Sequence, residues 1–148
     1  MSSIFDVANT FINIGVNAPE PITNMKLQKL LYYAQGWYLA TTNNELFSED
    51  FEHWTYGPVC PVIYQEFRCF GANPIDRPSA TGNAIIDGEI FDFINAIWKM
   101  YGCFNGVELS VQTHKEDPWL TTPKFEIIKK EAMKIFFKKE LKKLLGDK

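Results

Sequence analysis

The sequence has few of the residues that cross-link small proteins or carry out catalysis. It contains three cysteines, Cys60, Cys69 and Cys103, and no CxxC pair. An odd number of cysteines without paired spacing argues against a disulfide framework and favours a reducing compartment. The two histidines, His53 and His114, match no zinc-binding pattern when combined with the cysteines. We therefore expect no metal and no cofactor.

Long hydrophobic runs and targeting signals are also missing. No stretch reaches the roughly 18 apolar residues that a membrane span needs. The N-terminus, MSSIFDVANT, has no basic region ahead of an apolar run. These absences predict a cytoplasmic protein that has no signal peptide and no contact with a membrane.

The short motifs that mark common enzyme classes do not occur. There is no G-x-S-x-G, no Walker loop, no G-x-G-x-x-G and no H-E-x-x-H. We therefore expect a protein that is not an enzyme and has no catalytic residues. One enzymatic alternative stays open: a hydrolase in which Cys60 or Cys103 pairs with His114.

Positive charge is scarce outside the C-terminus. Residues 124–148 hold nine lysines and four acids, whereas residues 1–123 hold six basic and fourteen acidic residues. An acidic body repels nucleic acid and favours cationic partners. In the tail, helical spacing separates Phe136 and Phe137 from the lysines. An amphipathic helix therefore explains the tail better than RNA or DNA binding does.

Apolar residues recur at helical spacing along most of the 148 residues, with turn residues between the repeats. This length suits one domain, over residues 1–148. Helices are predicted over residues 3–14, 23–41, 61–70, 87–101, 105–113 and from 125 or 128 to 145. Leu46-Phe47 and Phe51–Trp54 predict a hairpin, and Tyr56-Gly57-Pro58 predicts a turn. The expected fold is mainly α (α+β), a compact bundle of about six helices with a small antiparallel β-hairpin.

The helix over residues 23–41 has the clearest pattern. Its apolar face is wide, and its polar side chains fall mostly on other sides: Lys26, Gln28, Lys29 and Gln35. Lys29 is therefore predicted to lie on a solvated face. Tyr32 and Tyr33 are predicted to lie mostly in the core, with their hydroxyls reaching the surface.

Three separated segments, residues 29–37, 51–59 and 113–119, are unusually rich in aromatic residues, glycine, proline and histidine. One interpretation is a packed corner of the core, in which His114 and Trp119 cover the turn at residues 56–58. The other is a partly exposed aromatic surface that anchors a partner, because Trp and Tyr are enriched in binding hot spots. The two interpretations are compatible.

The same segments carry a resemblance to a known family. The sequence resembles the SocA-like antitoxins, which have a Panacea domain and occur among phage-associated proteins of the GepA type. The matching motifs are L-x-K-L-L-Y-Y-A-Q-G-W at residues 27–37, F-E-x-W-x-Y-G-P-V at 51–59, P-V-I-Y at 61–64 and T-H-x-x-x-P-W at 113–119. His53 departs from the family pattern, which more often has a small residue there.

The resemblance implies a mainly helical, non-enzymatic protein that neutralises a toxin by direct contact. The expected partner is a protein toxin encoded by a neighbouring gene. The residues expected to contact it, or to support the contact, are Trp54, Tyr56, Pro58, His114 and Trp119. A second interpretation is an adaptor that delivers a bound protein to a cellular protease, for which the lysine-rich last helix would offer a surface. The sequence leaves the oligomeric state open.

Overall fold

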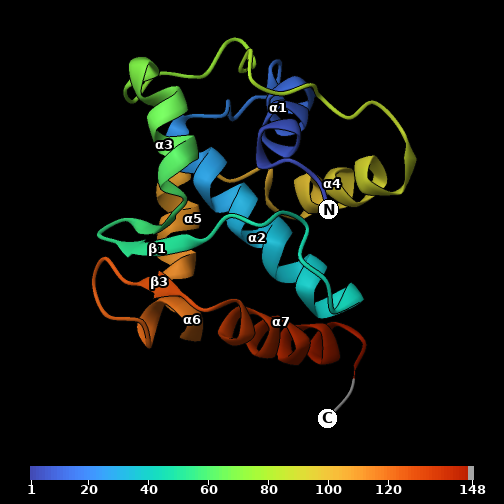
Figure 1. Ribbon diagram of the computed structural model, residues 1–148, viewed down its shortest axis with the longest axis vertical. Helices are drawn as coiled ribbons and strands as arrows, with labels where there is room; N and C mark the ends of the chain where they lie inside the picture. Colours follow the sequence, from blue (N-terminus) through green and yellow to red (C-terminus); the bar gives the residue numbers. More distant parts are fainter. Residues whose placement is uncertain (147–148) are drawn as a thin grey trace.

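The computed structural model describes residues 1–146 as helices packed around one central helix, with a small sheet at one side (Figure 1). The helices are α1 (Ile4–Gly15), α2 (Asn24–Thr42), α3 (Pro61–Phe67), α4 (Gly88–Tyr101), α5 (Gly106–Thr113), α6 (Asp117–Leu120) and α7 (Lys130–Leu144). A 3-10 turn, η1 (Arg68–Phe70), continues α3. The strands are β1 (Phe51–Trp54), β2 (Gly57–Val59) and β3 (Ile127–Ile128). The predicted mainly α fold with a minor β part is confirmed.

The helices begin where side chains can satisfy their first amide groups. The Ser3 hydroxyl accepts a hydrogen bond from the Phe5 amide at the start of α1, and the Thr23 hydroxyl accepts one from the Lys26 amide in α2. Asn105 and Glu108 form a complete capping box at the start of α5. These caps set the helix starts close to the positions that the sequence predicts.

Helix α2 runs diagonally through the centre of the molecule (Figure 1). It contacts α1, α3, α4, α5, α7 and β2. Because these elements surround it, α2 has no solvent-exposed face over most of its length. Its polar residues Lys26, Gln28, Lys29 and Gln35 are all buried. The prediction that Lys29 lies on a solvated face was wrong, and the other three polar residues, although they fall outside the predicted apolar face, are buried as well.

Two buried glutamines of α2 form side-chain hydrogen bonds with backbone groups that have no partner in a neighbouring strand. Gln35 accepts a hydrogen bond from the Leu46 amide and donates one to the Phe47 carbonyl, both at 2.7 Å. Gln28 accepts a hydrogen bond from the Cys60 amide at 2.8 Å. Leu46-Phe47 is therefore not a strand, and the predicted hairpin with Phe51–Trp54 was wrong. A side-chain amide takes the place of the expected strand partner.

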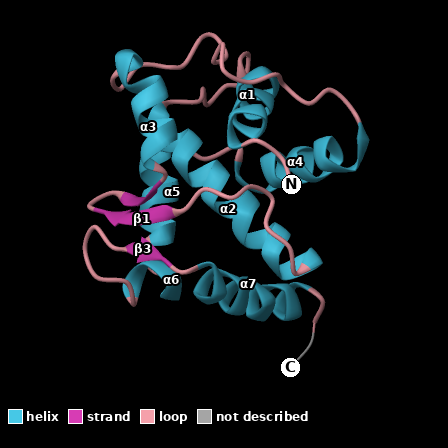
Figure 2. Ribbon diagram, viewed as in Figure 1, coloured by secondary structure: helices cyan, strands magenta, loops and turns pink. Residues whose placement is uncertain are grey.

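The observed hairpin lies one segment later in the chain. Strand β1 pairs antiparallel with β2, so that His53 lies opposite Pro58 and Trp54 opposite Gly57. Tyr56 lies at the tip, as predicted for a turn, while Gly57 and Pro58 belong to β2. Strand β3 pairs with the other edge of β1, giving the order β2-β1-β3. Figure 2 shows these strands between α3 and α6.

The C-terminal part of the chain differs from the prediction in two details. Helix α5 ends at Thr113, as expected, but it is followed by a turn, and Asp117-Pro118 begins the short helix α6 instead of acting as the break. Proline is tolerated in the first turn of a helix. Residues 127 and 128 form β3, so α7 begins only at Lys130. The Lys130 ammonium donates hydrogen bonds to the Ser48 carbonyl at 3.0 Å and to Asp50 at 2.6 Å, which ties α7 to the segment before β1.

No helix in the described part of the chain combines the length and the apolar character needed to cross a membrane.

Candidate functional site

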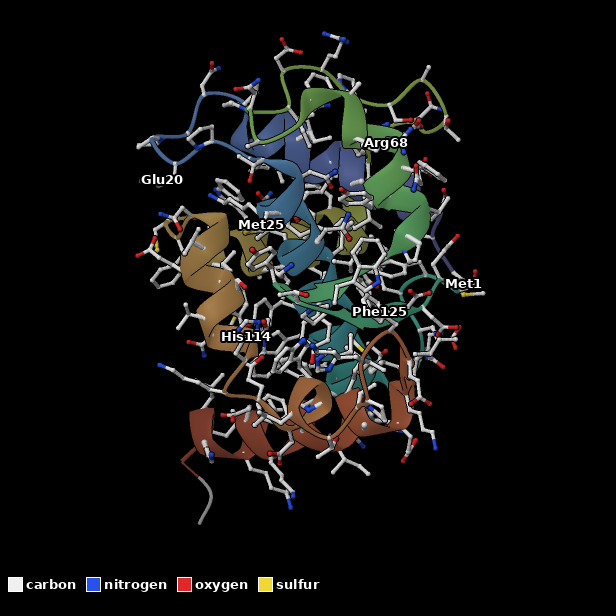
Figure 3. The ribbon with its side chains drawn as sticks, turned by 90° about the vertical axis from the view of Figure 1, so that its left-hand side faces the viewer. Met1, Glu20, Met25, Arg68, His114 and Phe125 are labelled. Atoms are coloured by element: carbon white, nitrogen blue, oxygen red, sulfur yellow. The ribbon has the colours of Figure 1, made fainter. Side chains whose placement is uncertain are left out.

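The candidate site is a cavity of about 640 Å³ beside the hairpin. Residues of α2, α3, η1, the hairpin and the start of α5 line it, together with Phe125 from the loop before β3. Figure 3 faces this side of the molecule, with Met25, Arg68 and Phe125 labelled around it. A volume of this size falls in the range of pockets that hold small ligands or protein side chains.

Three apolar side chains at this cavity are largely exposed. Tyr56 at the hairpin tip and Val107 on α5 each keep 63% of their surface exposed, and Phe125 keeps 67%. Phe125 also has a left-handed backbone, with φ of 65°. A bulky residue rarely adopts this conformation without a compensating requirement. The rim thus presents apolar surface that the fold itself leaves uncovered.

Buried lysine 29 lies at the floor of the same cavity. Lys29 is 1% exposed and lines the cavity, and its ammonium donates a hydrogen bond to the Pro58 carbonyl at 3.2 Å. Burial lowers the pKa of this amine to about 7. The site therefore combines an apolar rim with a buried amine.

Gly57 places the hairpin directly on that lysine. Its φ of 110° lies in the region that favours glycine. A Cβ at this position would stand 2.7 Å from Lys29 Cε and 2.7 Å from Thr113 Oγ1. The absence of a side chain thus lets β2 pack against both α2 and α5.

Gly57→Ala is expected to destabilise the protein by about 1–3 kcal/mol, because alanine adds backbone strain to these close contacts. Chemical denaturation of the purified variant measures the change. Gly71→Ala is the matched control, since Gly71 also has a positive φ, of 59°, but no atom lies within 4 Å of its added Cβ. Equal losses in the two variants would show that packing on Lys29 and Thr113 contributes nothing.

A stack of three rings supports the hairpin from the side of α6. Trp119 lies between His53 at 4.0 Å and His114 at 4.1 Å, measured between ring centroids. The Trp119 indole donates a hydrogen bond to the Trp54 carbonyl at 3.1 Å. Burial, followed by the charge of Lys29, lowers the pKa of His114, so the neutral ring is favoured.

The five residues predicted from the sequence fall into two groups. Trp54 and Tyr56 line the cavity, whereas His114 and Trp119 belong to the stack beside it. Pro58 is buried and offers its carbonyl to Lys29. The structure therefore brings all five close to one hairpin, although Tyr56 alone among them is largely exposed. Whether they bind a partner stays a prediction.

The sequence interpretation missed Val107, Phe125 and the burial of Lys29. The local signal for Lys29 was mixed, because Tyr32 and Tyr33 lie one turn after it while the polar residue Lys26 lies one turn before it. Phe125 carries no comparable signal. Its role depends on β3 pairing with β1, a contact between segments more than 70 residues apart. The hydroxyl of Tyr32 is buried without a partner among the described atoms, so its predicted surface position was wrong.

The environment of Cys60 does not favour a nucleophilic thiolate. Cys60 is buried, and burial raises the pKa of its thiol to about 11, the opposite of what a nucleophilic cysteine needs. Cys69 and Cys103 are exposed. Within residues 1–146, no group of three or more His, Cys, Asp or Glu residues is arranged to hold a metal ion.

Comparisons with known proteins identify similar sequences. The model of the family described as "Antitoxin SocA-like, Panacea domain" matches residues 27–120. "Antitoxin SocA" of Caulobacter vibrioides (strain NA1000 / CB15N) is 45% identical over 127 residues, a match that covers 76% of this chain and 66% of that protein. The chain thus spans just under two thirds of the length of that relative. No solved structure matches the chain.

Proposed function

We propose, because the chain belongs to the SocA-like antitoxin family with a Panacea domain, that it is an antitoxin that neutralises a protein toxin by direct contact. The observation that carries this proposal is the cavity with its exposed apolar rim, an arrangement typical of docking surfaces. The proposed partner is the product of a neighbouring gene. We place the interaction in the cytoplasm, in keeping with the free thiols.

The rim is supported in a way that suits recognition. The Ser110 hydroxyl donates a hydrogen bond to the Tyr56 carbonyl at 2.6 Å, and the Trp119 indole holds the Trp54 carbonyl. These bonds fix both sides of the hairpin tip to α5 and α6. A surface that is ordered before binding loses less conformational entropy when a partner docks. The aromatic side chains would therefore act as preformed anchors.

We propose binding without catalysis. The raised pKa of the Cys60 thiol supports this proposal, because it argues against a hydrolase that uses Cys60 as its nucleophile. The toxin would be inhibited when its surface is covered, with no covalent change in either protein. Labelling with a thiol reagent across pH is the corresponding check: a thiolate that forms below pH 7 and reacts fast at Cys60 would contradict the proposal.

Co-expression with the product of the neighbouring gene tests the proposed function. We expect growth arrest when that product is expressed alone, rescue by this chain, and a stable complex on size exclusion. Rescue with no complex and a shortened toxin lifetime would instead indicate delivery to a protease. The absence of both rescue and a complex would contradict the antitoxin proposal.

Phe125→Ala is expected to weaken the complex by about 30-fold, because truncation of an aromatic anchor at a binding site costs about 2 kcal/mol or more. Phe104→Ala is the matched control, since Phe104 is 41% exposed and does not line the cavity. Isothermal titration with the purified toxin measures both affinities. Equal affinities of the two variants would show that the cavity rim is not the contact.

A second matched pair lies on α5. Val107 lines the cavity, whereas Val111, one turn later, is 48% exposed and does not line it. Arginine at position 107 would fill the mouth of the cavity, while arginine at 111 would leave it open. We therefore expect Val107→Arg to abolish rescue of growth and Val111→Arg to preserve it.

A further inference from the structure

Lys29 is a buried cation that has no acidic partner in the fold. Within residues 1–146, no carboxylate forms a salt bridge with it, and desolvation is the only influence that shifts its pKa. Its ammonium has three N–H donors and one observed acceptor, the Pro58 carbonyl. A buried charge without a counter-charge is costly, so proteins normally pair it.

Lys26, one turn earlier on the same helix, shows how this chain satisfies a buried lysine. Its ammonium donates to the Glu20 carbonyl at 2.7 Å and to the Gly102 carbonyl at 2.6 Å, and it lies 4.8 Å from the centre of the Trp98 ring. Burial lowers the pKa of Lys26, but the charges of Glu20 and Glu108 oppose this effect and favour the protonated form. Lys26 does not line the cavity. The lysine with the incomplete environment is thus the one that belongs to the cavity lining.

We propose that the cavity accepts an acidic side chain, Asp or Glu, from an apolar segment of the bound protein, and that Lys29 is its counter-charge. This inference rests on the proposed function and names the chemistry of the partner. The apolar rim of Tyr56, Val107 and Phe125 receives the flanking apolar side chains, and the carboxylate reaches the ammonium at the floor. Charge complementarity selects this occupant over a purely apolar one.

Two further observations fit an anionic group at this place. Arg68 also lines the cavity, and the lining includes no aspartate or glutamate. Burial lowers the pKa of Lys29 to about 7, because the surrounding protein only partly replaces the hydration of its ammonium. A carboxylate that binds there would restore the charged form. Lys29 would then form a charge-assisted hydrogen bond, which is stronger than a bond between neutral groups.

Lys29→Met tests the inference with two readouts that move in opposite directions. We expect the free protein to melt at a higher temperature, because the uncompensated charge is gone. We expect its affinity for the neighbouring-gene toxin to fall at least tenfold, because the carboxylate loses its partner. A purely structural lysine would lower both quantities together. Lys26→Met is the control: it is expected to lower the melting temperature and leave the affinity unchanged.

A scan of the toxin identifies the carboxylate. Each Asp is changed to Asn and each Glu to Gln, and binding to wild type and to Lys29→Met is measured. We expect one position whose change weakens binding to wild type at least tenfold and has little further effect on Lys29→Met. Lys29→Gln repeats the cycle with a polar side chain in case the methionine variant folds poorly. Unchanged affinity in both variants, or no coupled position, would overturn the inference.

A small probe separates failure of this inference from failure of the proposed function. Amide chemical shifts of Gly57 and Gly106, which adjoin the cavity, are followed during titration with 3-phenylpropionate or its neutral amide. Stronger binding of the acid, lost in Lys29→Met, supports carboxylate recognition. Toxin capture with equal binding of acid and amide overturns this inference alone. No toxin capture overturns the proposed function and, with it, the assignment of the occupant.

Discussion

Replacement of Phe137 by alanine is expected to lower the free energy of unfolding by about 3–5 kcal/mol. Phe137 is 1% exposed and forms the contact of α7 with the central helix α2. Its ring lies 5.2 Å from that of Trp37 and 5.9 Å from those of Tyr32 and Tyr33. Truncation removes the whole ring from this cluster and leaves a cavity that the surrounding rigid rings fill poorly.

Gly36 is the reason that Phe137 fits. A Cβ at position 36 would lie 2.2 Å from Phe137 Cε2, so the ring occupies the space in which a side chain would stand. Gly36→Ala is therefore expected to be destabilising alone, and less so when combined with Phe137→Leu. Such coupling is typical of residues in direct contact.

Urea denaturation of the single and double variants measures these changes. Phe136→Ala is the control, because Phe136 is the neighbouring, half-buried ring of the same helix. A loss below about 0.5 kcal/mol for Phe137→Ala, within the range of ordinary surface substitutions, would contradict the proposed role of this contact.

Glu116→Gln is expected to stabilise the protein at pH 8 by up to about 3 kcal/mol and to have little effect at pH 4. Glu116 is 7% exposed, and its carboxylate accepts hydrogen bonds from the Tyr33 hydroxyl at 3.1 and 3.2 Å. Burial, with a smaller contribution from the charge of Glu140, raises the pKa of Glu116 to about 7 against the opposing effect of hydrogen bonds from Tyr33 and Gln112.

The sign follows from the protons bound in each state. Between about pH 4.5 and 7 the folded protein holds a proton on Glu116 that the unfolded chain has already released. The contribution of Glu116 to the free energy of unfolding is therefore fully present below pH 4.5, decreases as the pH rises and is lost above pH 7. Thermal melts of wild type and variant from pH 4 to 8 measure the difference. A constant difference across this range would contradict the raised pKa.

Lys29 changes the stability of the fold in the opposite direction to Glu116, and it does so at higher pH. Its pKa is about 7 in the folded protein and near 10.5 in the unfolded chain, so the unfolded chain holds more protons between these values. Stability therefore rises with pH across that window. Together, Glu116 and Lys29 predict a minimum of stability near pH 7. Glu116→Gln is expected to remove the fall in stability below pH 7, and Lys29→Met is expected to remove the rise above it.

Part of the candidate site could be predicted from the sequence, and part could not. Trp54, Tyr56, His114 and Trp119 were recognisable because aromatic residues, glycine and proline cluster around them in short motifs. Phe125 and Val107 were not, because each is an ordinary apolar residue whose exposure depends on where β3 and α5 pack. Local composition therefore located the hairpin but not the cavity beside it.

The sequence by itself determined the helices other than α6, the caps of α1 and α2, the family and the mainly α fold, because periodicity and capping are properties of neighbouring residues. Only the tertiary structure decided which side of α2 is exposed to solvent, and almost no part of this helix is exposed. A helix surrounded by neighbours buries its polar residues as well, so Gln35 replaces a strand partner and Lys29 becomes the floor of a cavity. Burial is set by what packs from elsewhere in the chain, and no local pattern contains that information.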